Sequence, residues 1–103
     1  HLMRAEAMLR GGAGDALAEV NELRTLRNAT PLSALTLQDM IDERGRELYV
    51  EFYRRNDLLR FGQFTKAIEQ KDPNTVGNAT MNLFPMPIAV LISNPNLVQN
   101  PGY

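Results

Sequence analysis

The residues best suited to chemistry lie in one block of the chain, residues 42–60. The block reads DERGRELYVEFYRRNDLLR and contains five acidic residues and five arginines. A carboxylate pair such as Glu47 and Glu51 could serve glycoside hydrolysis, which needs one carboxyl group with a raised pKa beside one that stays ionised. Interleaved arginines have the opposite effect, because they lower carboxyl pKa values and keep both groups charged. The block therefore favours ion pairing over catalysis.

A structural ion network is the interpretation that this charge balance supports. Glu43, Glu47 and Glu51 follow one another at four-residue intervals, so on a continuous helix their like charges repel unless cations lie among them. Arg54 lies three residues after Glu51 and three before Asp57, and on a helix it can be shared between the two carboxylates. We predict a structural ion network with these members: Glu43, Arg44, Glu47, Glu51, Arg54, Asp57 and Arg60.

Other site chemistries find little support in the sequence. There is no cysteine and only one histidine, His1, which would have no partner as a metal ligand. An anion clamp built from Arg54, Arg55 and Arg60 would have to compete with the neighbouring acids. The net charge of -1 indicates no nucleic-acid partner. We predict no catalytic residue, no metal site and no cofactor, and the sequence assigns no ligand-binding residue.

The first 30 residues are predicted to form a helical hairpin. Residues 2–9 are rich in strong helix formers and read as the end of a helix already under way, which stops at the glycines of residues 11–14. Asp15 can cap a second helix that reaches about Arg27, with apolar residues at the helical period. One such pair loosely resembles a tetratricopeptide unit, which needs stacked neighbours to bury its face.

The charged block belongs to a predicted helical region, residues 36–70. Thr36 followed by Asp39 is typical of a capping box, and the helix that it starts is expected to run to about Tyr53 and then to bend near residues 53–56. Residues 71–82 are polar and form a predicted loop.

Residues 83–103 form a predicted irregular strap. Pro87 can start a short helical turn through Ser93, and two Asn-Pro turns follow, one of which ends in Gly102. Such turn chemistry predicts a tail that is tied down on a folded body. With no convincing strand pattern, the class is all-α, with tetratricopeptide-like helix pairs and a C-terminal wrap.

Three segments in order resemble the C-terminal end of the SusD/RagB family of outer-membrane nutrient-binding lipoproteins. They are LMRAEAML with ALAEVNELR, then ERGRELYVEFYRRNDLLRFG, then LFPMPIAVLISNPNLVQNPGY. Glu51, Arg54, Asp57 and Arg60 match the family pattern, whereas Phe52 stands where the family usually has glycine. The resemblance implies that residues 1–103 are the C-terminal part of a larger α-helical SusD-like domain.

The resemblance also implies a function for the whole protein. Family members bind oligosaccharides or other nutrients, are not enzymes, and work with a SusC-like TonB-dependent transporter. They sit on the cell-surface side of the outer membrane, anchored through a lipidated N-terminal Cys that this chain does not contain. Their ligand sites lie mainly in the part that precedes this segment. The alternative is a free-standing helical interaction module of tetratricopeptide type.

Overall fold

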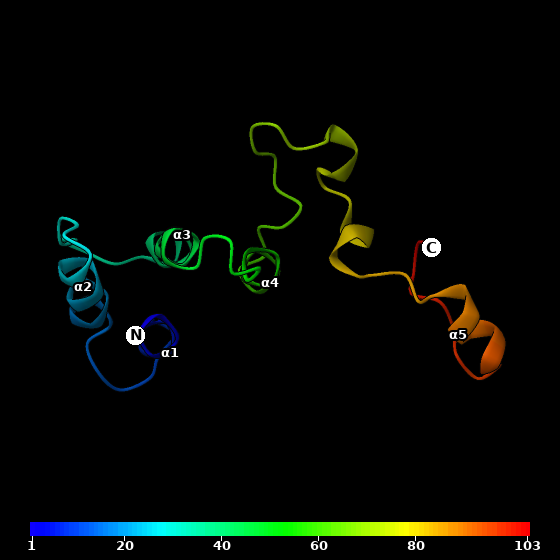
Figure 1. Ribbon diagram of the computed structural model, residues 1–103, viewed down its shortest axis with the longest axis horizontal. Coiled ribbons are helices and arrows are strands. Elements are labelled where there is room, and N and C mark those ends of the chain that lie inside the picture. Colours follow the sequence, from blue (N-terminus) through cyan, green and yellow to red (C-terminus); the bar gives the residue numbers. More distant parts are fainter. The chain divides into compact units, whose positions relative to one another are not determined.

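The computed structural model describes residues 1–103 and contains α-helices without β-strands, as predicted (Figure 1). The chain divides into two units, His1–Asp57 and Leu58–Tyr103. Five α-helices occur in the order α1 (Leu2–Leu9), α2 (Ala16–Leu26), α3 (Leu37–Glu47), α4 (Arg54–Arg60) and α5 (Ile88–Ser93). No helix combines the length and the apolar composition that a membrane span requires.

Helices α1 and α2 form the predicted hairpin. Its turn depends on glycine, because a Cβ atom at Gly12 would lie 2.8 Å from the carbonyl oxygen of Ala7. After the turn, the Asp15 carboxylate accepts a hydrogen bond of 3.0 Å from the backbone N–H of Ala18, which caps α2. The predicted bounds of both helices are confirmed to within a residue.

Helix α3 starts with the predicted capping box. The Thr36 hydroxyl accepts from the N–H of Asp39, while the Asp39 carboxylate accepts from the N–H of Thr36. The connection before it is tied to α2 by Asn21, whose side chain bonds both the N–H and the carbonyl of Leu32. These local bonds define where α3 begins and place it beside the hairpin.

The core of the first unit lies where α1, α2 and α3 meet. Six buried apolar side chains come from these three helices: Leu2, Ala5, Val20, Leu23, Met40 and Ile41. The same helices also bury charged residues, which make the site described below.

The prediction that the helix from Thr36 continues to about Tyr53 is wrong. Helix α3 ends at Glu47, and the chain turns before α4 starts at Arg54. Val50 and Phe52 adopt positive φ angles of 67° and 63°. Residues other than glycine and asparagine are strained in this left-handed conformation, bulky and β-branched ones most of all. The break therefore begins directly after Glu47, earlier than expected.

The cause of the break is tertiary. The Arg54 guanidinium donates a hydrogen bond of 2.8 Å to the carbonyl oxygen of Ile41, which lies within α3. That contact, across 13 residues, requires the chain to turn back between the two helices. Phe52 takes up the bend although it has a side chain where the family pattern usually has glycine.

Residues 61–70 belong to the region that was predicted to be helical. They contain no helix, because α4 ends at Arg60 and the next element begins at Pro73. Two short 3₁₀ turns, Pro73–Thr75 and Ala79–Asn82, lie within the predicted loop. Helix α5 begins directly after Pro87 and ends at Ser93, as expected from the fixed φ of proline.

The strap is closed on itself by its last residues. The Gln99 side chain accepts from the N–H of Met86 at 2.7 Å and donates to the carbonyl of the same residue at 3.0 Å. Asn100 donates to the carbonyl of Phe84, and the Tyr103 hydroxyl donates to the carbonyl of Leu83 at 3.0 Å. The tail is thus held by side chains that bond backbone groups some 13 to 20 residues earlier.

Candidate functional site

The centre of the charged block is Arg44, which is only 5% exposed. Its Nη2 atom lies 2.9 Å from Oδ1 of Asp57, and its Nη1 atom lies 3.9 Å from Oε2 of Glu6. Glu6 in turn accepts a hydrogen bond of 2.9 Å from Nε of Arg10. One buried guanidinium therefore connects α1, α3 and the first turn of α4.

A second set of ion pairs joins α2 to α3. Glu43 lies 2.6 Å from Nη1 of Arg24 and 2.6 Å from Nη2 of Arg46. Glu47 accepts two hydrogen bonds from Arg27, of 2.6 and 3.2 Å. Bidentate pairing of this kind favours one relative orientation of the two helices.

The structure separates the seven residues of the predicted ion network. Arg44 and Asp57 pair directly, whereas Glu43 pairs with Arg24 of α2 and Glu47 pairs with Arg27 at the C-terminal cap of that helix. The Arg60 guanidinium lies over the ring of Phe61, 5.6 Å from its centroid.

Two of the local pairings expected from helical spacing are wrong. Glu51 lies exposed on the turn after α3, away from the helical row that Glu43 and Glu47 share. Arg54 donates to a backbone carbonyl and does not bridge Glu51 and Asp57. Both differences follow from the early end of α3, because the spacing argument assumed a continuous helix.

Hydrogen bonds lower the pKa values of two acids on α3, Glu47 and Asp39. Hydrogen bonding from Arg27 lowers the pKa of the Glu47 carboxyl below its usual range, and its charge acts in the same direction. At the start of α3, the hydroxyl and the N–H of Thr36 lower the pKa of Asp39. A general acid in glycoside hydrolysis needs a raised pKa, so the charge environment of Glu47 opposes that role.

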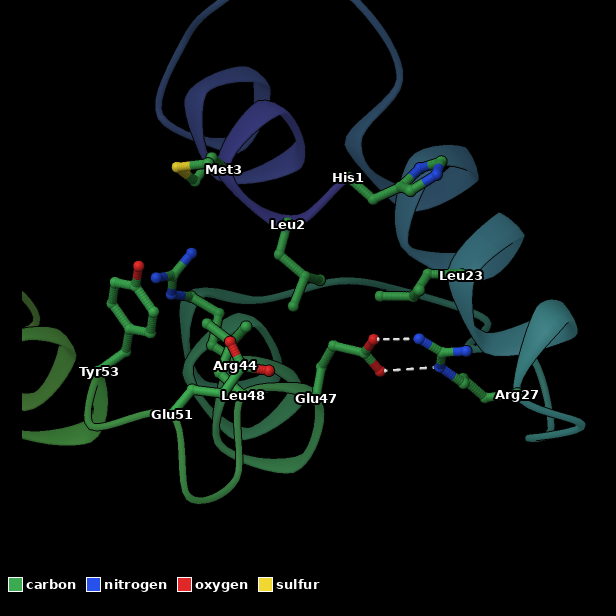
Figure 2. Close-up of a pocket in the computed structure, with 10 residues that line it drawn as sticks. All are labelled: His1, Leu2, Met3, Leu23, Arg27, Arg44, Glu47, Leu48, Glu51 and Tyr53. Atoms are coloured by element: carbon green, nitrogen blue, oxygen red, sulfur yellow. Dashed lines mark hydrogen bonds and ion pairs between the residues drawn. The ribbon is translucent and has the colours of Figure 1, made fainter.

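A cavity of about 390 Å³ opens beside Arg44 (Figure 2). Its walls come from all three helices of the first unit and from the turn that follows them. The lining residues are His1, Leu2, Met3, Leu23, Arg27, Arg44, Glu47, Leu48, Glu51 and Tyr53. The Arg27–Glu47 ion pair forms one side, and Tyr53 lies toward the other (Figure 2).

His1 has acidic neighbours that its sequence position did not reveal. Its Nδ1 atom lies 2.9 Å from Oε1 of Glu19, and ligand atoms of His1, Glu19 and Glu22 lie within 4.8 Å of one another. The prediction that His1 has no partner is therefore wrong. Arg4 also approaches Glu19 at 3.3 Å, so this group is satisfied as an ion cluster.

Comparison with known proteins assigns the chain to a family. The sequence model of the SusD family matches residues 1–103, the whole of the chain. The chain belongs to the SusD family. Among curated proteins, it is 40% identical over 110 residues to the starch-binding protein SusD of Bacteroides thetaiotaomicron. That alignment covers all of this chain but only 20% of the relative, so the chain spans about a fifth of the length of SusD.

Sequence reasoning missed several partners in this SusD-family site, namely Glu6, Arg24 and Arg27. A signal was present, because two arginines three residues apart, one in the last turn of α2 and one at its C-terminal cap, match two glutamates four residues apart on α3. Spacing alone does not say which helices face each other, and local pairs within one helix were the simpler interpretation.

Proposed function

We propose that this chain is the C-terminal helical region of a cell-surface protein that binds glycans or similar nutrients for uptake. The observation that supports this is the match of the SusD family to the entire chain, together with 40% identity to a relative named for starch binding. Because the chain spans a fifth of that relative, the activity belongs to the whole protein.

The proposal includes a location and a partner. By its family resemblance, the whole protein is an outer-membrane lipoprotein that faces outward and is anchored through a lipidated N-terminal cysteine outside this chain. It would pass its ligand to a SusC-like TonB-dependent transporter. The ligand-binding residues would lie mainly in the part of the protein that precedes these 103 residues.

The proposed protein binds its ligand without transforming it. Glu47 pairs with Arg27 at 2.6 Å, and the hydrogen bond from that arginine lowers the pKa of the Glu47 carboxyl. In this region the charged residues would join helices, with Arg44 holding α4 to α3 through Asp57. The role of the seven-residue ion network is thus proposed to be structural.

The test uses the complete protein with starch-derived and other oligosaccharides. Isothermal titration calorimetry should detect reversible binding to at least one glycan, while a reducing-end assay detects no hydrolysis. The Glu47→Gln variant should bind with unchanged affinity. Hydrolysis that disappears in Glu47→Gln would overturn the non-enzymatic proposal, and failure to bind any glycan in the panel would overturn its ligand class.

A second candidate is a helical interaction module of tetratricopeptide type. The packed α1–α2 helix pair with its glycine turn is the observation that favours it. Affinity purification of the tagged protein from membranes separates the two candidates. A TonB-dependent transporter among the captured proteins supports the uptake role, and its absence together with a lack of glycan binding supports the module.

A further inference from the structure

The cavity beside Arg44 has a mixed lining that points to a particular kind of occupant. We call it the Arg44 groove and define its working surface by Leu2, Met3, Leu23, Leu48 and Tyr53, with Arg44 between them. Four of the five surrounding side chains are aliphatic. Met3 is 81% exposed and Tyr53 is 50% exposed, so the groove carries apolar surface that this unit leaves uncovered.

Arg44 brings unmet hydrogen-bonding capacity to this groove. Its Nε and Nη1 atoms are buried and have no hydrogen-bond partner, although Nη2 is paired with Asp57. Figure 2 shows the guanidinium directed between Leu2 and Tyr53. A buried donor without a partner destabilises the folded state, and native proteins rarely keep such groups. An acceptor that enters the groove would remove this cost.

The local charge indicates that this acceptor is neutral. Asp57 at 2.9 Å and Glu6 at 3.9 Å already balance the guanidinium. Glu47 on the wall is neutralised by Arg27, while the Glu51 carboxylate adds a negative charge that no arginine offsets. An entering anion would be repelled, whereas a carbonyl or amide oxygen would accept a hydrogen bond without adding charge.

The apolar part of the groove suits a polypeptide better than a sugar. The hydroxyl groups around the edge of a sugar ring need hydrogen-bond partners, which Leu2, Leu23 and Leu48 cannot supply, and Arg27 and Glu47 on the wall already bond each other. A peptide segment offers both an apolar side chain and a backbone carbonyl. A tetratricopeptide-like hairpin also buries its face only against a stacked neighbour, and α1 and α2 both contribute to the groove.

We propose that the Arg44 groove seats a segment of the same SusD-family protein that lies outside these 103 residues. The segment places an apolar side chain between Met3 and Tyr53 and offers a carbonyl oxygen to Arg44. This chain matches only 20% of SusD, so most of a family-length polypeptide is available to supply it. The inference rests on family membership and is independent of which ligand the protein binds.

The test is site-specific photo-crosslinking in the complete protein. A benzophenone amino acid replaces Met3, an exposed groove residue whose substitution leaves the core of the unit intact. The matched control carries it at Ala13, which is exposed in the glycine turn outside the groove. After irradiation of dilute protein, mass spectrometry should find Met3 joined within the same polypeptide to one peptide outside residues 1–103, at a yield at least fivefold above Ala13.

Each other outcome would overturn the proposal. Equal yields at Met3 and Ala13, or no crosslink at Met3, would mean that the groove is open to solvent. A crosslink between two molecules whose yield rises with protein concentration would identify a second copy as the occupant. Loss of the internal crosslink on addition of oligosaccharide would identify the groove as a ligand site.

Discussion

The Arg44–Asp57 pair should contribute more to stability than any other single ion pair in the first unit. Both side chains are buried, with side-chain exposures of 6% and 3%. Replacing Asp57 with Asn removes the nearer acidic partner of Arg44 and leaves only Glu6, at 3.9 Å, in a site where two of the guanidinium nitrogens already have no hydrogen-bond partner. Removing one member of a buried pair costs about 3–5 kcal/mol, and we expect that range for Asp57→Asn.

The Arg27–Glu47 pair is the matched control because it shows whether burial or the distance between the charged atoms determines the energy of an ion pair. Its atoms are closer, 2.6 Å against 2.9 Å, but its side chains are 62% and 22% exposed. If distance decided the energy, Glu47→Gln would be the more harmful change. Exposed pairs contribute about 0–1 kcal/mol because water screens them, so we expect Glu47→Gln to cost less than about 1 kcal/mol.

Urea unfolding of the complete protein, followed by circular dichroism, measures both free energies. Hydrogen exchange at residues 37–60 reports the local effect if the whole protein unfolds in several steps. The double variant Arg44→Met with Asp57→Leu should recover most of the loss, because neither charge is then left buried. The reasoning is refuted if Glu47→Gln destabilises as much as Asp57→Asn, or if the double variant is no more stable than Asp57→Asn.

The remaining predictions concern the strap and acid stability. Gly102→Ala should destabilise residues 83–103 by more than about 1 kcal/mol, because φ is +91° and the Thr80 side chain occupies the position of the new Cβ; hydrogen exchange of the strap measures this. Gln99→Leu should open the same segment by about 1 kcal/mol, because both backbone groups of Met86 lose their partner; limited proteolysis should then cut the tail faster. The pKa of Glu47 is lowered in the folded state, so its contribution is present at neutral pH and lost as pH falls below about 4; urea midpoints from pH 7 to pH 3 should fall less steeply in Glu47→Gln.

Controls for these predictions come from the chain itself. Gly77 also has a positive φ, of 72°, but a Cβ atom added there would meet nothing within 4 Å, so Gly77→Ala reports backbone strain alone. An equal effect of the two glycine variants would show that the Thr80 contact is unimportant. Unchanged proteolysis of Gln99→Leu would mean that Asn100 and Tyr103 hold the strap without it. An acid profile of Glu47→Gln identical to that of the unchanged protein would contradict the lowered pKa.

Elements with local causes were predictable from sequence. The starts of α2 and α3 follow from Asp15 and from the Thr36–Asp39 capping box, which act over three residues. The start of α5 follows from the fixed φ of Pro87. The all-α class and the family resemblance were also confirmed, because both depend on sequence patterns between residues that lie close together in the chain.

The end of α3 depended on contacts that no local pattern records. Residues 48–53 have ordinary helical spacing, but Arg54 bonds the carbonyl of Ile41 and Asp57 pairs with Arg44, and both contacts require a turn between the helices. The strain at Val50 and Phe52 is offset by those tertiary contacts. Helix propensity alone favoured the longer helix, but these tertiary contacts ended it at Glu47.

By itself, the sequence determined that the chain is helical, that its charged block favours ion pairing over catalysis, and that it resembles a nutrient-binding family. Composition and short-range spacing are sufficient for these conclusions. Tertiary structure alone decided which charges meet: Arg24 of α2 and Arg27 at its C-terminal cap pair with glutamates of α3, and Arg44 is left for Asp57 and Glu6. The physical reason is that an ion pair depends on which helix faces are brought together, and packing of the apolar core sets that choice.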